Sequence, residues 1–134
     1  MSTRARTFDY AVEVDEAWDA RSERGGTTIT ADEEHWAPEH LVLAGLARCS
    51  LTSLRYHCRR AGFDLSSRAS VRGTVTRRDD DGRFAFVEIT VEADVAFEPK
   101  PDAETVSDLL MKGERDCFVG ASLTARPTYD WHVA

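Results

Sequence analysis

The segment that organises this 134-residue chain reads PEHLVLAGLARCSLTSLRYHCRRA and runs from Pro38 to Ala61. Pro38 suits the first position of a helix, where its missing N–H leaves no hydrogen bond unmade. Glu39 suits the first turn, where the helix dipole favours an anion. Gly62 follows the segment and is typical of a helix C-terminal cap. The segment therefore predicts one long helix.

The first half of this predicted helix is apolar on every side. Leu41 to Ala47 is the longest uninterrupted apolar run in the sequence and covers nearly two helical turns. A helix of this kind must be covered all round, and one sheet covers only one side of it. Either a second helix of the same chain covers the other side, or a second subunit covers it in an intertwined homodimer.

Composition favours a single soluble domain spanning residues 1–134. The formal net charge of −7 disfavours nucleic acid and anionic membranes as partners. The seven-residue apolar run is too short to cross a bilayer, for which about 20 residues are needed. Three cysteines without framework spacing indicate reduced thiols, and so a cytoplasmic location. We expect no cofactor and no metal, because the cysteines and histidines lack ligand spacing.

The remaining segments predict strands on both sides of the long helix and a second helical region near the end. Alternating apolar residues predict a half-buried strand from Phe8 to Val14. The expected later segments are a turn at Arg24-Gly25-Gly26, strands at Thr27–Thr30, Val71–Arg77 and Phe84–Phe97, a hairpin turn at Asp79–Gly82, and a last strand at Thr128–Val133.

The second helical region is expected to begin after Asp102, a suitable N-cap, and to run through Met111. Gly113 is expected to interrupt it, and the helix to resume over Glu114–Leu123. The order of elements predicts an α+β fold, with the helices gathered on one face of a mainly antiparallel sheet.

The three cysteines have different predicted settings. Cys49 overhangs the turn that contains Gly45, and this glycine leaves open space beside the sulfur. Cys58 lies nine residues further on and points the opposite way, which favours a packing role. Cys117 lies in the second helical region, 68 residues after Cys49. Packing of the two helices would bring Cys49 and Cys117 together, although the spacing alone does not require it.

Two motifs resemble those of a known family. Ala37 to Ser50, APEHLVLAGLARCS, resembles the P-E-x-L…A-x-C helix of the OsmC/Ohr family of thiol peroxidases, which reduce organic hydroperoxides. Glu114 to Cys117 is similar to the segment that carries the second cysteine of that family. The resemblance covers nearly the whole chain. It implies an OsmC-like fold. With the all-round apolar helix it leads us to expect an intertwined homodimer.

The resemblance also implies site residues. Cys49 corresponds to the thiol that attacks the peroxide, and Cys117 to the thiol that resolves the resulting sulfenic acid as a disulfide. Glu39 falls at the position of the family's glutamate. Arg24 is the best match to the family's N-terminal arginine, with Arg21 as the second choice. The implied partners are an organic hydroperoxide and a dithiol that reduces the disulfide.

The chain departs from the family after the second cysteine. Phe118-Val119-Gly120 stands where family peroxidases commonly have a proline and then a serine. The departure bears on substrate preference and is compatible with a divergent, weakly active relative. Two other functions are alternatives to the enzyme. One is a binding module of the same fold that holds a small lipid-like ligand, and the other is a stress-associated dimer with inert thiols.

Overall fold

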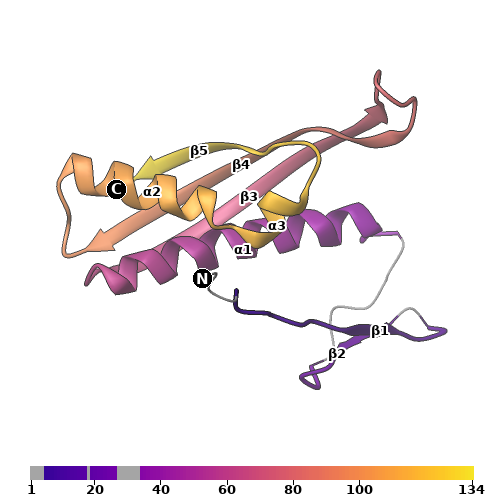
Figure 1. Ribbon diagram of the computed structural model, residues 1–134, viewed down its shortest axis with the longest axis horizontal. Helices are drawn as coiled ribbons and strands as arrows, with labels where there is room; N and C mark the ends of the chain where they lie inside the picture. The colour runs from indigo at the N-terminus through magenta and orange to yellow at the C-terminus, as the bar shows by residue number, and fades with distance from the viewer. Residues whose placement is uncertain (1–4, 18, 27–33) are drawn as a thin grey trace. The chain divides into compact units, whose positions relative to one another are not determined.

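The chain folds as two compact units, Met1–His40 and Leu41–Ala134. The computed structural model describes residues 5–17, 19–26 and 34–134. Figure 1 shows that the long helix α1 and the long strands β3 and β4 provide most of the regular structure. Within the described residues, no helix is both long and apolar enough to span a bilayer.

Helix α1 extends from Pro38 to Arg60, within one residue of the predicted helix. Its buried side chains recur at helical spacing, and they are Leu46, Ser50, Ser53, Leu54 and Cys58. Leu41 and Val42 remain 47% and 38% exposed. The helix therefore buries one face within its own chain, while part of its all-round apolar segment stays uncovered.

The main sheet has three strands in the order β3-β4-β5. They are β3 (Asp64–Arg77), β4 (Phe84–Glu98) and β5 (Thr128–Val133). β3 and β4 pair antiparallel, and β4 and β5 pair parallel. The hairpin turn is confirmed, with Gly82 at a φ of 70°. β3 begins seven residues before the predicted Val71, because backbone pairing with β4 continues through a segment that lacks apolar alternation.

The core lies on one face of β4. Its inward side chains alternate with polar ones along the strand, and they are Ile89, Val91, Ala93, Val95 and Phe97. Leu54 and Cys58 of α1 and Leu109 of the next helix pack against the last three of these. The helices therefore cover one face of the sheet, as the α+β prediction expects, and the other face is polar.

The second helical region consists of α2 (Ala103–Arg115) and α3 (Phe118–Ser122). The predicted cap is confirmed, because the Asp102 carboxylate accepts a hydrogen bond of 2.8 Å from the Thr105 N–H. The predicted interruption at Gly113 is wrong. α2 continues through this residue, which is buried against Leu54 of α1, and the break falls at Asp116 and Cys117.

The first unit contains a small antiparallel hairpin of β1 (Val12–Val14) and β2 (Ala20–Ser22). The predicted strand from Phe8 is therefore too long, and its apolar side chains are exposed rather than half-buried. β2 was not predicted as a strand. The predicted turn is present around Arg24, with Gly25 at a φ of 90°. The predicted strand at Thr27–Thr30 lies outside the described residues.

Candidate active site

Two of the three cysteines meet where α1 packs against α3. Cys49 is partly buried and Cys117 is fully buried, and neither forms a disulfide. The Val119 N–H donates to the Cys49 Sγ at 3.5 Å, and the Gly120 N–H donates to the Cys117 Sγ at 3.4 Å. Two neighbouring backbone amides of α3 therefore hold two sulfurs that are 68 residues apart in sequence.

The Cys49 thiol has an altered proton affinity. Burial raises the pKa of Cys49, the hydrogen bond from the Val119 N–H opposes this rise, and the hydrogen bond with the neighbouring Cys117 thiol raises the pKa further. The net effect favours the neutral thiol. Ionisation of Cys49 at neutral pH would therefore need a cation beyond these contacts.

Open space lies beside Cys49 on its own helix. A methyl group placed on Gly45 would meet no described atom within 4 Å. The sequence predicts open space at this glycine, and we keep access of a small molecule to Cys49 through that space as a prediction.

A pair of hydroxyl groups lies against Cys117. Ser50 is fully buried, and its Oγ lies 3.6 Å from the Cys117 Sγ and 3.0 Å from the Tyr129 Oη. Burial raises the pKa of Tyr129 to about 12. The sequence does not predict either of these residues as part of the site. Ser50 is signalled only by its place next to Cys49, and no local pattern links it to Tyr129 in β5.

Charged side chains fix the end of α2 next to Cys117. The Asp116 carboxylate binds the His57 ring at 2.8 Å and the Arg115 guanidinium at 2.9 Å. Hydrogen bonds from Arg115 and then His57 lower the pKa of Asp116 to about 2. Because His57 belongs to α1, this cluster ties the α2–α3 junction to the helix that carries Cys49.

The remaining predicted site residues belong to the first unit. Arg24 is exposed, and its guanidinium lies over the Tyr10 ring at 5.6 Å from the centroid. Arg21 is exposed on β2, in register with Glu13. Glu39 is exposed in the first turn of α1. Ten residues of unbroken helix separate Glu39 from Cys49, an axial rise of about 15 Å, so these two side chains do not meet within one chain.

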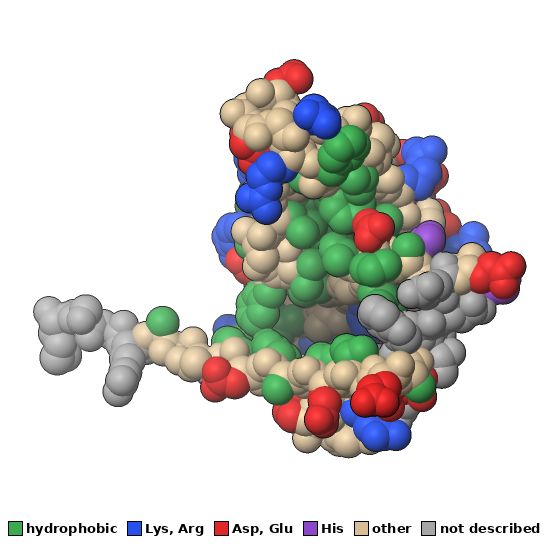
Figure 2. Space-filling view, turned by 90° about the vertical axis from the view of Figure 1, so that its right-hand side faces the viewer, with side chains coloured by type: hydrophobic (Ala, Val, Ile, Leu, Met, Phe, Trp, Pro, Cys, Tyr) green, Lys and Arg blue, Asp and Glu red, His purple; other side chains and the backbone are tan. Residues whose placement is uncertain are grey.

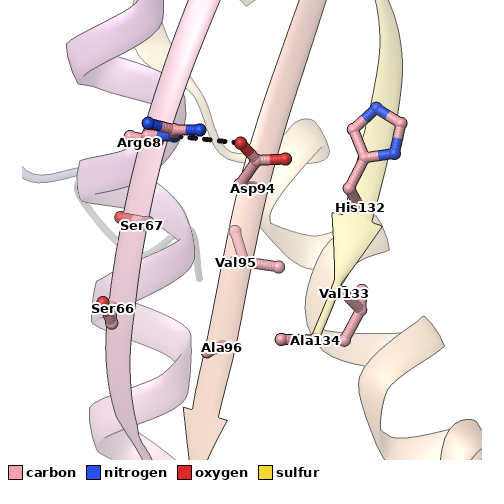
Figure 3. Close-up of a pocket in the computed structure, with 9 residues that line it drawn as sticks. All are labelled: Ser66, Ser67, Arg68, Asp94, Val95, Ala96, His132, Val133 and Ala134. Carbon is pink, nitrogen blue, oxygen red and sulfur yellow. Dashed lines mark hydrogen bonds and ion pairs between the residues drawn. The ribbon is translucent and has the colours of Figure 1, made fainter.

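A groove of about 510 Å³ lies on the outer, polar face of the sheet (Figure 3). Its lining includes the ion pair between Arg68 and Asp94, whose Nε and Oδ2 atoms are 3.0 Å apart. It contains no cysteine and lies on the side of the sheet away from the two thiols.

A potential metal-ligand cluster lies on the same face. Ligand atoms of Glu92, Asp130 and His132 lie within 4.8 Å of one another. The sequence analysis missed this cluster, because two strands bring its members together. All three side chains are exposed, and His132 is already paired with both carboxylates. The arrangement is accounted for by surface ion pairs.

The fold and the sequence together define the class of this protein. Residues 31–132 match the model of the OsmC-like protein family, so the chain belongs to that family. The comparison with curated proteins found no match.

Several solved structures share the fold at low identity. An OsmC-like protein of unknown function from Vibrio cholerae matches with a TM-score of 0.77 and 11% identity, over 93% of this chain and 99% of its own. An OsmC-like protein from Mycoplasma pneumoniae matches with a TM-score of 0.69 and 16% identity, over 98% of each chain. The organic hydroperoxide resistance protein OhrB of Bacillus subtilis matches with a TM-score of 0.57 and 18% identity, over 96% of this chain and 98% of its own.

Proposed function

We propose that this protein is a cysteine-based peroxidase that reduces organic hydroperoxides to alcohols. The observation that carries the proposal is the contact between the Cys49 and Cys117 thiols beneath the amides of α3. The thiol that resolves the sulfenic acid must come within bonding distance of the thiol that attacks the peroxide, and Cys117 already neighbours Cys49 in the same cluster. The naming of OhrB as an organic hydroperoxide resistance protein supports the substrate class.

The proposed chemistry has three steps. The Cys49 thiolate attacks one peroxide oxygen, the O–O bond breaks, and the departing alkoxide takes a proton to become an alcohol. Cys49 is left as a sulfenic acid. The Cys117 sulfur then attacks the Cys49 sulfur, the S–O bond breaks, and water leaves as the disulfide forms. An external dithiol reduces the disulfide and restores both thiols.

Arg24 and Glu39 are assigned mainly to charge stabilisation, although Arg24 would also supply the cation that ionisation of Cys49 needs. An unperturbed thiol of pKa near 8.5 is about 3% ionised at pH 7, and lowering its pKa by two units raises that fraction roughly 25-fold. The same shift weakens the nucleophile roughly 8-fold, so the net gain is only about threefold. Arg24 would therefore act mainly on the departing oxygen, with Glu39 holding its guanidinium.

One observation favours a second function. The raised pKa of Cys49 is what an inert thiol would have, and it fits a binding module or a stress-associated dimer that performs no turnover. The open space at Gly45 would then hold a small apolar ligand. Peroxide treatment separates the two functions, because only the enzyme loses two thiols rapidly.

The decisive experiment compares the wild type with Cys49→Ser and Cys117→Ser. We expect Cys49→Ser to abolish consumption of cumene hydroperoxide. Cys117→Ser should complete one turnover and then fail to recycle with a dithiol. Peroxide loss, free thiols and protein mass give the readout. Equal activity in the three proteins would refute the assignment.

A further inference from the structure

The hydroxyl pair beside Cys117 consists of the fully buried Ser50 and the partly buried Tyr129. Ser50 and Cys117 have no exposed surface, and Ser50 contacts both the Cys117 Sγ and the Tyr129 Oη. Tyr129 is also close enough to Cys117 for the Cys117 side chain to contribute to the raised pKa of Tyr129. Two hydroxyl groups, from α1 and from β5, therefore converge on one sulfur.

Packing alone does not explain this pair. A buried hydroxyl costs free energy unless it is hydrogen-bonded, and replacing two bonded partners by apolar groups of similar shape is often nearly neutral. Alanine and phenylalanine would fill the same positions without any hydroxyl group. We therefore expect the hydroxyl groups to serve the neighbouring Cys117 sulfur by hydrogen bonding.

The arrangement suits a sulfur that changes its charge. The Gly120 N–H already donates to the Cys117 Sγ. The hydroxyls can point either way. The Cys117 S–H can donate to Ser50, or Tyr129 can donate to Ser50 while Ser50 donates to a Cys117 thiolate. Hydrogen bonds to a charged sulfur are stronger than hydrogen bonds to a neutral one.

We propose that Ser50 positions the Cys117 sulfur and donates a hydrogen bond to it while it captures the Cys49 sulfenic acid, and that Tyr129 orients the Ser50 hydroxyl for this role. The inference rests on the proposed function. In this step the Cys117 sulfur supplies the electron pair of the new S–S bond, and the S–O bond of Cys49 breaks. The departing hydroxide takes the proton that Cys117 loses and leaves as water. The same donor stabilises the Cys117 thiolate when an external dithiol opens the disulfide.

A single-turnover experiment tests the role of the hydroxyls. The reduced protein is mixed with one equivalent of cumene hydroperoxide, quenched at intervals, and treated with dimedone and a thiol-alkylating reagent. Protein mass then gives separate rates for sulfenic acid formation and for disulfide formation. Ser50→Ala and Tyr129→Phe should leave the first rate within about twofold. They should slow the second roughly 10- to 100-fold, the loss expected for hydrogen bonds to a charged group.

The double variant Ser50→Ala/Tyr129→Phe leaves no hydroxyl unpaired, so it tests the inference even if a single variant folds poorly. Ser53→Ala is the matched control, because Ser53 on the same helix is buried and its hydroxyl bonds to no described residue. Tyr56→Phe is the control for the loss of a tyrosine hydroxyl at an exposed position. Both controls should keep both rates.

The possible outcomes are distinct. Slower disulfide formation with unchanged sulfenic acid formation supports the inference. Unchanged disulfide formation in the double variant, or equal slowing of both steps, overturns it and leaves the proposed function standing. A wild type that forms no sulfenic acid overturns the proposed function and this inference with it.

Discussion

At the scale of single residues, three identical side chains occupy three different environments. Cys49 is partly buried beside open space, Cys117 lies under two hydroxyls, and Cys58 is fully buried in the core against Leu54 and β4. Burial raises the pKa of Cys58 to about 11. Its thiol therefore stays neutral at physiological pH and unreactive.

Cys58→Ala should keep peroxide reduction at the wild-type level and lower the free energy of unfolding by about 1–2 kcal/mol. The loss reflects the cavity left in a closely packed core. Urea unfolding and a peroxide assay on the same protein give both values. A Cys49–Cys58 disulfide in the oxidised protein would contradict the packing role.

The two candidate cysteines can be predicted from the sequence, whereas the hydroxyl groups that surround Cys117 cannot. A recognisable motif carries Cys49, and a second segment carries Cys117, so the two residues stand out as single positions. Ser50 and Tyr129 meet although 79 residues and four other elements separate them in the sequence. Such a contact depends on how α1 packs on β5, and local periodicity carries no information about it.

At the scale of elements, the sequence predicts the beginnings of helices better than their interruptions. Pro38 and Asp102 mark the starts of α1 and α2 because each meets a local chemical requirement of a helix terminus. Gly113 misleads, because glycine within a helix either breaks it or allows close contact with another element. Here a methyl group at Gly113 would lie 3.2 Å from the Leu54 Cβ and 3.3 Å from its Cα.

Gly113→Ala should therefore destabilise the protein by about 1 kcal/mol, although alanine is the better helix former. The gain in propensity is up to about 1 kcal/mol, while overpacking a core typically costs about 1–3 kcal/mol. The cost applies here because the contact includes the backbone of α1. Gly45→Ala is the matched control: it meets no described atom within 4 Å and should gain stability. Equal gains for both variants in urea unfolding would contradict the close contact.

At the scale of the whole molecule, one chain leaves apolar surface uncovered. Leu41 and Val42 of α1 are exposed, together with Phe84 and Val87 of β4 and Phe118 of α3. Figure 2 shows hydrophobic side chains gathered on the side of the second unit that faces the viewer. From the sequence, either a second helix of the same chain or a second subunit could cover the apolar segment of α1. The exposure of Leu41 and Val42 in this chain favours the second subunit, and we therefore propose that the protein is a homodimer.

A homodimer would also complete the proposed site. Glu39 and Cys49 lie about 15 Å apart along the axis of one helix. An ion pair of Arg24 with Glu39 would therefore not contact Cys49 of the same chain. If two α1 helices pack antiparallel across a two-fold axis, the start of one lies beside the middle of the other. Glu39 and Arg24 of one subunit would then serve Cys49 of its partner.

Subunit mixing tests this arrangement. Cys49→Ser and Glu39→Ala subunits, each inactive alone, are unfolded together, refolded, and assayed for consumption of cumene hydroperoxide. A mixed dimer holds one site with both residues intact, so at equal input we expect about a quarter of the wild-type activity, because half of the dimers are mixed and each has one working site of two. Differently tagged subunits and tandem purification establish that mixed dimers form. Mixed dimers without activity would place Glu39 and Cys49 in the same site of one chain, because every such dimer would then carry two damaged sites.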